Sequence, residues 1–437
     1  MTRGARLLLV ACLAAHAAGA AAEVGSSPDI PAAITLADAL RIARERAPDR
    51  AIADAAVSSA QAQVRVAGAL PNPAASFMVG WSSQCDQAGC GQPIYSAGLG
   101  DQGLVAFLVT GQRGLAVDAA EHALRGATST RRDVERNLDF QVKQQFVTTA
   151  VAARAVEISR QEAALAGQTV ELARRRRDSG AISDADVARL EVLAMQIEQL
   201  VDRAVQGMEQ ARASLAQQMG LRAGAPAFSV VPGPTATALP PSQLAEATLE
   251  TLTSRAKETR PDLVAVRAQL DAARSQASLA RRLAIPQFQL QAQYQQQGNA
   301  TGGWFTPPTA SVGLSLPLPI LYQQQGQIGQ ADAAVSAAEW AVAKIEAQIV
   351  AEVSTAYTAY RTSRASAERA ERRLLPRSAD ARKLVETQYQ KGAASLLDYL
   401  DAQRTHLTNE IDYLAALASF WTAVFQLEQA VGASYVP

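Results

Sequence analysis

Two carboxylates stand three residues apart in the C-terminal part of the chain, at Asp398 and Asp401. If this segment is helical, the i, i+3 spacing puts both side chains on one face. Acidic side chains gathered at one place favour cations and repel anions. The alternative is structural, because Asp398 follows Ser395 at the spacing of a capping box, and Asp401 would complement the helix dipole. The two roles are compatible for Asp398.

Other residues that could do chemistry are sparse. Beyond the N-terminal segment the only histidines are His122 and His406, which we interpret as solvated helix residues. Cys85 and Cys90 lie in a Gly-, Gln- and Ser-rich stretch expected to be a loop, where an exported protein could form a small disulfide; free thiols or a metal pair are the alternative. The sequence has no phosphate loop, nucleophile elbow or zinc motif, so we expect no enzyme, no cofactor and no selective metal site. A formal charge of zero argues against nucleic-acid binding.

The elements that must position these residues come in two copies. Four short motifs recur at offsets of 212 to 215 residues, which indicates a duplicated architecture. The pairs are 48–49 with 261–262, 69–72 with 284–287, 111–114 with 326–329, and 180–183 with 392–395. Each copy is predicted to contain a helix, a strand, a loop, a strand, a very long helix, a tight turn and a return helix.

The expected boundaries follow from this plan. The first repeat covers 23–220, with strands 74–82 and 103–110, a long helix 111–179, a tip 180–183 and a return helix 184–220. The second covers 242–437, with strands 287–295 and 309–317, a long helix 326–391, a tip 392–395 and a return helix 396–432. The Pro-rich segment 221–241 is expected to be an extended linker.

The positions of proline, glycine and serine predict long helical hairpins. The tract between Pro93 and Pro226 lacks proline, whereas Pro376 should kink or loosen the second long helix. A glycine at each tip supplies a left-handed residue, and a serine three positions later can cap the returning helix. The last helix also carries an apolar seam, which predicts antiparallel coiled-coil packing. Its residues are Leu400, Leu407, Ile411, Leu414, Ala418, Trp421 and Phe425.

The expected strands have the period of a half-buried sheet. Phe288, Leu290, Ala292 and Tyr294 alternate with glutamines, and Phe77, Val79 and Trp81 alternate with smaller or polar residues. Strands of about 9–11 residues cross a bilayer in a barrel, and aromatic residues gather at its interfaces. The aromatics near the expected strand ends are Trp81, Tyr95, Trp304 and Phe305. Because four strands cannot close a barrel, other copies of the chain must complete it.

The N-terminus resembles a secretory signal over 1–22. Arg3 and Arg6 precede an apolar run, and Ala20 to Ala22 offer a small-residue cleavage site. A lipoprotein box ending at Cys12 is the alternative. No later stretch reaches about 18 consecutive apolar residues, so any membrane crossing is expected to be by strands.

The signal, the duplicated plan and the tip segment 391–404 together resemble the outer-membrane efflux factors, the TolC-like exit ducts of tripartite pumps, over essentially the whole mature chain. The segments 70–73, 111–114 and 317–320 look most like the cobalt–zinc–cadmium efflux branch of that group. The resemblance implies a homotrimer in the outer membrane, with a 12-stranded β-barrel and a periplasmic α-barrel of helical hairpins. It also implies a periplasmic adaptor and an inner-membrane RND-type pump as partners.

The resemblance implies specific site residues and a passive function. Asp398 and Asp401 match two aspartates of the family's periplasmic gate, while the first copy has Asp186 and Arg189 there. The tips, which would dock the adaptor or serve only as hairpin turns, are Gly180, Ala181, Ile182, Ser183, Gly392, Ala393, Ala394 and Ser395. Divalent heavy-metal cations are the expected cargo; drugs, other small molecules or type I secretion are alternatives. A soluble periplasmic adaptor would explain the hairpins but not the four strands.

Overall fold

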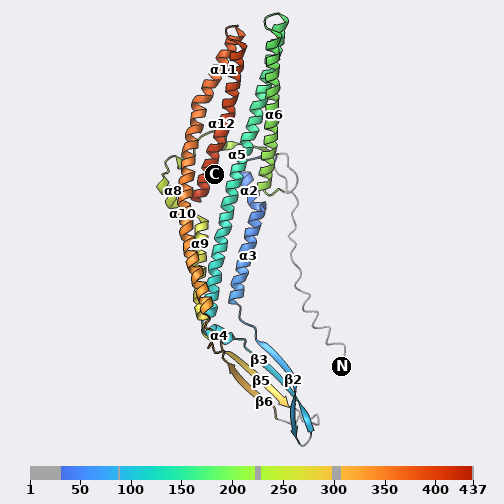
Figure 1. The fold of residues 1–437 in the computed structure, drawn as a ribbon, viewed down its shortest axis with the longest axis vertical. Coiled ribbons are helices and arrows are strands. Elements are labelled where there is room, and N and C mark those ends of the chain that lie inside the picture. The colour runs from blue at the N-terminus through green and yellow to red at the C-terminus, as the bar shows by residue number, and fades with distance from the viewer. Residues whose placement is uncertain (1–30, 87–88, 222–227, 298–306, 436–437) are drawn as a thin grey trace.

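The chain is elongated, with a small sheet at one end and two helical hairpin tips at the other (Figure 1). The computed structural model describes residues 31–86, 89–221, 228–297 and 307–435. The expected signal segment 1–22 and the aromatics Trp304 and Phe305 lie outside the described residues. Among the described residues, no helix combines the length and the apolar character needed to cross a membrane.

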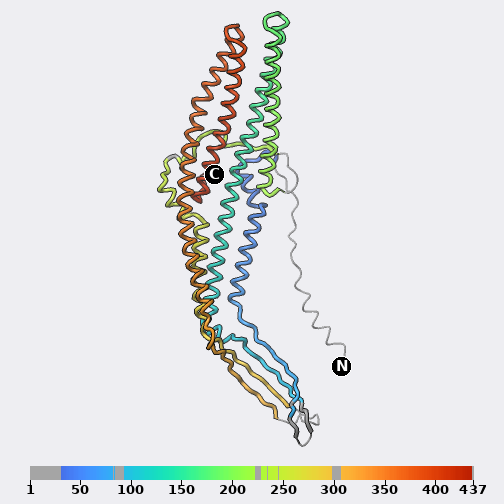
Figure 2. The backbone as a smooth tube through the Cα atoms, viewed as in Figure 1, coloured from blue at the N-terminus to red at the C-terminus, as the bar shows by residue number. Residues whose placement is uncertain are grey.

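Each copy opens with a matching pair of short helices. The pairs are α2 (Leu36–Arg46) with α3 (Pro48–Gly68), and α8 (Leu249–Thr259) with α9 (Pro261–Arg282). Thr35 and Thr248 begin α2 and α8 with capping boxes, which satisfy amide groups of the first turn. Proline then starts α3 and α9, where its missing N–H costs nothing. These short helices lie along the long helices of the hairpins (Figure 2).

Four antiparallel strands form one sheet in the order β2-β3-β5-β6. Their bounds are β2 Ala74–Asp86, β3 Gly89–Gly100, β5 Gln289–Gln297 and β6 Thr309–Ser315. The register sorts the side chains by face, because Phe77, Ala97, Tyr294 and Ala310 stand in one row. The next row, on the opposite face, consists of Met78, Ser96, Gln295 and Thr309. One face is thus mostly apolar and the other carries Gly, Ser and Gln.

The prediction of a strand at 103–110 is wrong. Residues Leu104–Val109 form the short helix α4, and the strand that pairs with β2 is β3, further upstream. An unbroken apolar run cannot be assigned to helix or strand by periodicity. Here Asp101 favours the helix, because its carboxylate accepts hydrogen bonds from the N–H groups of Gly103 at 3.1 Å and Val105 at 3.3 Å at the helix start. In the second copy, the described residues between β6 and the next long helix contain no counterpart of α4.

Two long antiparallel hairpins make up most of the molecule. The first is α5 (Gln112–Asp178, 67 residues) with α6 (Asp184–Gln218). In the second, α10 (Gln325–Arg369), a π-helical turn (Ala370–Leu374) and α11 (Leu375–Gln390) precede α12 (Leu396–Val431). The predicted loosening at Pro376 is confirmed: the proline lies in the first turn of α11, directly after the π-helical turn. A proline cannot donate to the preceding turn, and a π-turn is one way to accommodate that loss.

The predicted seam of α12 is only half of its packing surface. Leu414, Trp421 and Phe425 are buried as expected, but Ile411 is 36% exposed. A second row, shifted by about a residue, is also buried because α12 packs on α10 and α11 on one side and on α5 on the other. This second row consists of Tyr399, His406, Leu417, Phe420 and Val424.

The hydrophobic core lies at mid-length, around the end of α12 (Figure 1). The prediction of a simply extended linker at 221–241 needs correction. Ser229–Val230 (β4) pairs in parallel with Ala33–Ile34 (β1), a 3₁₀ turn follows at Gly233–Ala236, and Ser242–Ala245 forms α7. The indole of Trp421 donates to the carbonyl of Thr237 at 2.9 Å, so the linker packs against the core.

Candidate functional site

Both hairpins end at the same end of the molecule, in equivalent turns (Figure 2). Gly180 and Gly392 have φ values of 77° and 75°, the left-handed region that glycine adopts without strain. Ala181 N–H donates to Arg176 and Ala393 N–H to Gln388, each at 2.8 Å. These bonds form the Schellman pattern that satisfies the last carbonyls of a helix. A Cβ on either glycine would meet no atom within 4 Å, so both turns present an open surface.

Each return helix begins with a serine cap, as predicted. Asp398 N–H donates to Ser395 Oγ at 3.2 Å, while Ser395 N–H and Oγ donate to Asp398 Oδ2 at 3.0 and 2.6 Å. In the first copy, Ser183 and Asp186 repeat two of these bonds. Hydrogen bonds from the Ser395 side chain and backbone lower the pKa of Asp398 below its usual value, so this carboxyl stays ionised near neutral pH. The capping role of Asp398 is thus present in the structure.

Asp401 lies in a different setting. It lines a groove of about 490 Å³ between α6 and α12, near Arg189, Leu397 and Arg404. Asp401 is exposed and makes no hydrogen bond or ion pair within the described part of the chain. Its carboxylate is therefore free to act on solutes or on another chain.

Contacts between the two hairpins hold the tips together. Arg176 of α5 donates to the carbonyl of Gln390 at 3.0 Å and lies over the ring of Tyr389 at 5.5 Å. Tyr389 stacks on Tyr399 with ring centroids 5.0 Å apart, and the Tyr399 hydroxyl is 3.1 Å from Thr169 Oγ1. An arginine at the end of α11 also complements the helix dipole there. These residues carry no motif, so the sequence offered no means of finding this link.

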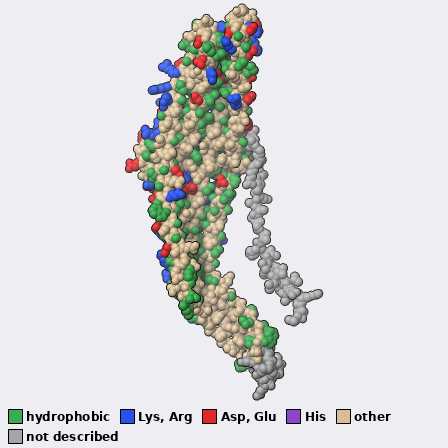
Figure 3. All heavy atoms as spheres, in the orientation of Figure 1, with side chains coloured by type: hydrophobic (Ala, Val, Ile, Leu, Met, Phe, Trp, Pro, Cys, Tyr) green, Lys and Arg blue, Asp and Glu red, His purple; other side chains and the backbone are tan. Residues whose placement is uncertain are grey.

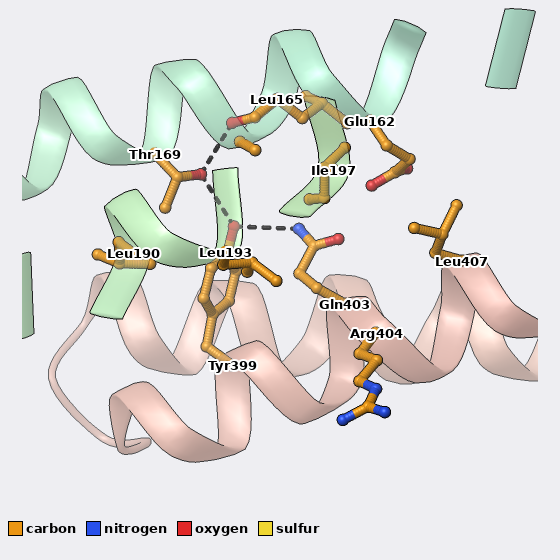
Figure 4. Close-up of a pocket in the computed structure, with 11 residues that line it drawn as sticks. Glu162, Leu165, Thr169, Leu190, Leu193, Ile197, Tyr399, Gln403, Arg404 and Leu407 are labelled. Carbon is orange, nitrogen blue, oxygen red and sulfur yellow. Dashed lines mark hydrogen bonds between the residues drawn. The ribbon is translucent and has the colours of Figure 1, made fainter. Parts of the chain in front are cut away.

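A small cavity of about 60 Å³ lies behind this link, where α5, α6 and α12 meet (Figure 4). Its wall combines leucine and isoleucine side chains with polar ones, and Gln403 donates to the Tyr399 hydroxyl at 3.0 Å. The Glu162 carboxyl closes one end, and burial raises the pKa of this group. The cavity wall is thus partly polar, although it lies between packed helices.

The prediction that His406 is a solvated helix residue is wrong. Its side chain is buried, with Nδ1 3.0 Å from Ser378 Oγ and Nε2 3.6 Å from Glu410. Burial lowers the pKa of His406, although Glu410 opposes that effect. Ser378 lies two residues after Pro376, so His406 packs against the loosened start of α11. His122 is less buried, and its Nδ1 lies 3.9 Å from Asp271.

The prediction that the two cysteines lie in a loop is wrong. Cys85 lies near the end of β2 and Cys90 near the start of β3. The register places Cys85 directly opposite Cys90. Among the described residues, no group of three or more His, Cys, Asp or Glu side chains could hold a metal ion. Figure 3 shows charged side chains mainly over the helical part, and few over the sheet.

The fold defines the class of protein. The chain superposes on a membrane protein from Pseudomonas aeruginosa with a TM-score of 0.76 and 23% identity, covering 91% of this chain and 90% of that one. It superposes on CusC, whose structures are described in terms of transmembrane channel formation, with a TM-score of 0.75 and 17% identity, covering 91% and 92%. At these identities the likeness shows the fold alone, a small sheet joined to long helical hairpins.

Sequence comparison then assigns the family. The family described as "Outer membrane efflux protein" matches residues 39–221 and 252–433, and the chain belongs to it. The cobalt-zinc-cadmium resistance protein CzcC of Cupriavidus metallidurans is 25% identical over 431 residues, or 97% of this chain and 98% of that protein. The protein is therefore an outer-membrane efflux channel with its helical part in the periplasm, and not an enzyme. The predicted family and fold class are confirmed.

Proposed function

We propose that three copies of the chain assemble into a passive exit duct of an RND-type tripartite efflux system. The observation that carries this proposal is the four-stranded sheet, in which β2 and β6 each have only one neighbour among the described strands. In lipid such edges must pair, because unsatisfied backbone groups are costly there. Three copies supply 12 strands, with the apolar face toward lipid and the Gly, Ser and Gln face toward the lumen. The hairpins continue this barrel as a periplasmic tunnel.

Divalent heavy-metal cations are the proposed cargo. The support is the full-length similarity to a cobalt-zinc-cadmium resistance protein and the exposed Asp401 carboxylate in the tip groove. Selectivity would reside in the pump, which delivers the cargo to the duct through a periplasmic adaptor. The adaptor would dock on the two tips, 180–183 and 392–395, whose turns are open to solvent.

A deletion strain tests the cargo. We expect loss of this protein to increase sensitivity to cobalt, zinc or cadmium, and expression of the intact chain to restore resistance. Dyes, detergents and antibiotics tested in parallel provide the comparison, because a drug duct would give the opposite pattern. Unchanged metal sensitivity with raised drug sensitivity would reject the metal assignment but not the channel.

Asp398 and Asp401 are proposed as a periplasmic gate. In a trimer the two residues form stacked rings of three carboxylates on the face of α12, and such rings attract cations. Asp398 would hold its side of the ring rigidly because Ser395 fixes its carboxylate. Asp401, which has no such bonds, would supply the more mobile ring.

Replacing both gate residues with asparagine should weaken divalent-cation block of single-channel conductance by roughly tenfold or more, because six charges leave one constriction. Asparagine keeps an oxygen that can accept the Ser395 bonds, so the cap survives. Asp186→Asn is the matched control, since Asp186 is the capping residue of the other hairpin. Divalent-cation block of the channel should be unchanged in this variant. Equal block in the wild type and the Asp398→Asn, Asp401→Asn variant would remove the gate assignment.

A further inference from the structure

An apolar collar surrounds the junction between the sheet and the helices. Four chain segments cross this junction, at 69–73, 101–111, 283–288 and 316–324, and each carries large side chains exposed to solvent. We call these residues the junction collar. Its members are Leu70 (49% exposed), Leu108 (50%), Val109 (73%), Leu283 (42%), Ile285 (43%), Leu318 (68%), Ile320 (77%) and Leu321 (98%). Hydrophobic surface is visible in Figure 3 where the helical part meets the sheet.

The collar segments contain almost no charge. Asp101 is the single charged residue in the four segments. Its carboxylate is occupied by backbone donors, including Leu290 N–H at 2.8 Å. Connections that face solvent are normally polar. Exposed apolar side chains in all four connections therefore indicate a surface that lipid or another protein covers.

Arginines follow immediately on the helical side. Within six residues of the collar, the adjoining helices α3, α5, α9 and α10 carry four arginines and neither aspartate nor glutamate. All four arginines are exposed; Arg281 also pairs with Asp332 at 2.6 Å, and Arg113 donates to the carbonyl of Gly68 at 3.0 Å. They are Arg65, Arg113, Arg281 and Arg282. Arginine forms bidentate hydrogen bonds with phosphate, so this row is suited to phospholipid headgroups.

The collar continues the apolar face of the sheet. In β6, the apolar face is formed by every second residue, Ala310, Val312 and Leu314. The same spacing continues beyond the strand with Leu316, Leu318 and Ile320. The backbone there has few groups to satisfy, since Pro317 and Pro319 have no N–H and Ile320 N–H donates to Leu318 at 2.9 Å. In the first copy, α4 satisfies its own backbone as a helix. Both arrangements are compatible with the boundary between acyl chains and headgroups.

We propose that the junction collar is a membrane-interface anchor that sits in the periplasmic leaflet of the outer membrane, with its arginines binding lipid phosphate. This rests on the proposed insertion of the sheet as a barrel. The collar fixes the depth at which the barrel stops and the periplasmic helices begin. A neighbouring copy of the chain is the competing occupant, and the experiment separates the two.

A photo-reactive residue placed at Val109 or Leu321 of the full chain tests the occupant. In vesicles of phosphatidylethanolamine and phosphatidylglycerol, we expect lipid adducts at both positions by mass spectrometry. Val312, on the apolar face of β6, is the positive control. Trp340 is the negative control: it is 77% exposed, but it lies 15 residues into α10, about 22 Å above the collar.

The outcomes distinguish the collar from the barrel. Lipid adducts at 312 with only protein crosslinks at 109 and 321 would overturn the collar and leave the barrel intact. No lipid adduct at 312 would overturn both. For the arginines, Arg65→Gln with Arg281→Gln and Arg282→Gln should reduce phosphatidylglycerol retained per trimer several-fold in native mass spectrometry. Arg274→Gln should not, because Arg274 lies two turns higher on α9; it is matched to Arg281, since each pairs with a carboxylate of α10. Equal retention in the two variants would contradict phosphate binding.

Discussion

Replacing Lys143 with methionine is expected to lower the free energy of unfolding by about 3–5 kcal/mol, because it leaves a buried carboxylate without its cation. Lys143 Nζ lies 2.6 Å from Glu428 Oε2 and 3.2 Å from Ser434 Oγ, and 5.4 Å from the centre of the Phe425 ring. The side chains of the pair are 8% and 5% exposed. Glu428 also accepts the Tyr435 N–H at 2.5 Å, so the pair fixes the C-terminal end of the chain to α5.

Thermal unfolding of the detergent-solubilised protein, followed by tryptophan fluorescence, measures this effect. Arg174→Met is the matched control, since Arg174 pairs with Glu171 and Glu191 at the surface. An exposed pair contributes about 1 kcal/mol or less. Adding Glu428→Gln to Lys143→Met should recover most of the loss, because the amide is neutral and still accepts from Tyr435. Equal melting temperatures for Lys143→Met and Arg174→Met would show that the pair does not hold the core.

The second large effect is expected at Gly220, which ends the first return helix. Its φ is 73°, and a Cβ there would lie 2.6 Å from the carbonyl oxygen of Arg46. Gly220→Ala should therefore cost about 1–2 kcal/mol for the left-handed backbone and a further 1–3 kcal/mol for displacing a main-chain atom of the α2–α3 connection. Gly432 holds the same place in the second copy, but there the nearest atom is the Arg260 side chain at 3.2 Å.

Gly180→Ala separates the two contributions. Gly180 has nearly the same φ, 77°, but its Cβ would meet nothing within 4 Å. We expect Gly180→Ala to lower the melting temperature slightly, Gly432→Ala more, and Gly220→Ala most. If Gly180→Ala and Gly220→Ala are equal, the contact between the return helix and the α2–α3 connection contributes nothing to stability.

The long hairpins could be predicted because their signals are local. Absence of proline permits a long helix, and a glycine followed by a serine marks the turn at each tip. The duplication reinforced each signal, since the second copy repeats it. The strand β3 could not be found in the same way, because its Gly, Ser and Pro content is typical of a loop and the apolar run beside it was the better strand candidate.

The site was only partly accessible from sequence. The Ser395–Asp398 cap follows from a spacing of three residues and was found. The burial of His406 and the Tyr389–Tyr399 stack depend on how α11 turns against α12, which no local pattern encodes. A gate is a property of several copies around one axis, so neither one sequence nor one chain contains its geometry.

The π-helical turn before Pro376 has a consequence for how the two copies could diverge. Gly111 to Gly180 spans 69 residues, whereas Gly326 to Gly392 spans 66. In a coiled coil, deleting three residues from the seven-residue repeat shifts the apolar seam by the same amount as inserting four. The helix must then unwind or overwind locally to bring the seam back to its partner. The wide turn at 370–374 is a place for that correction. We infer that the three-residue difference between the copies and the π-helical turn compensate each other, and that removing only one of them would shift the second hairpin out of phase with the first.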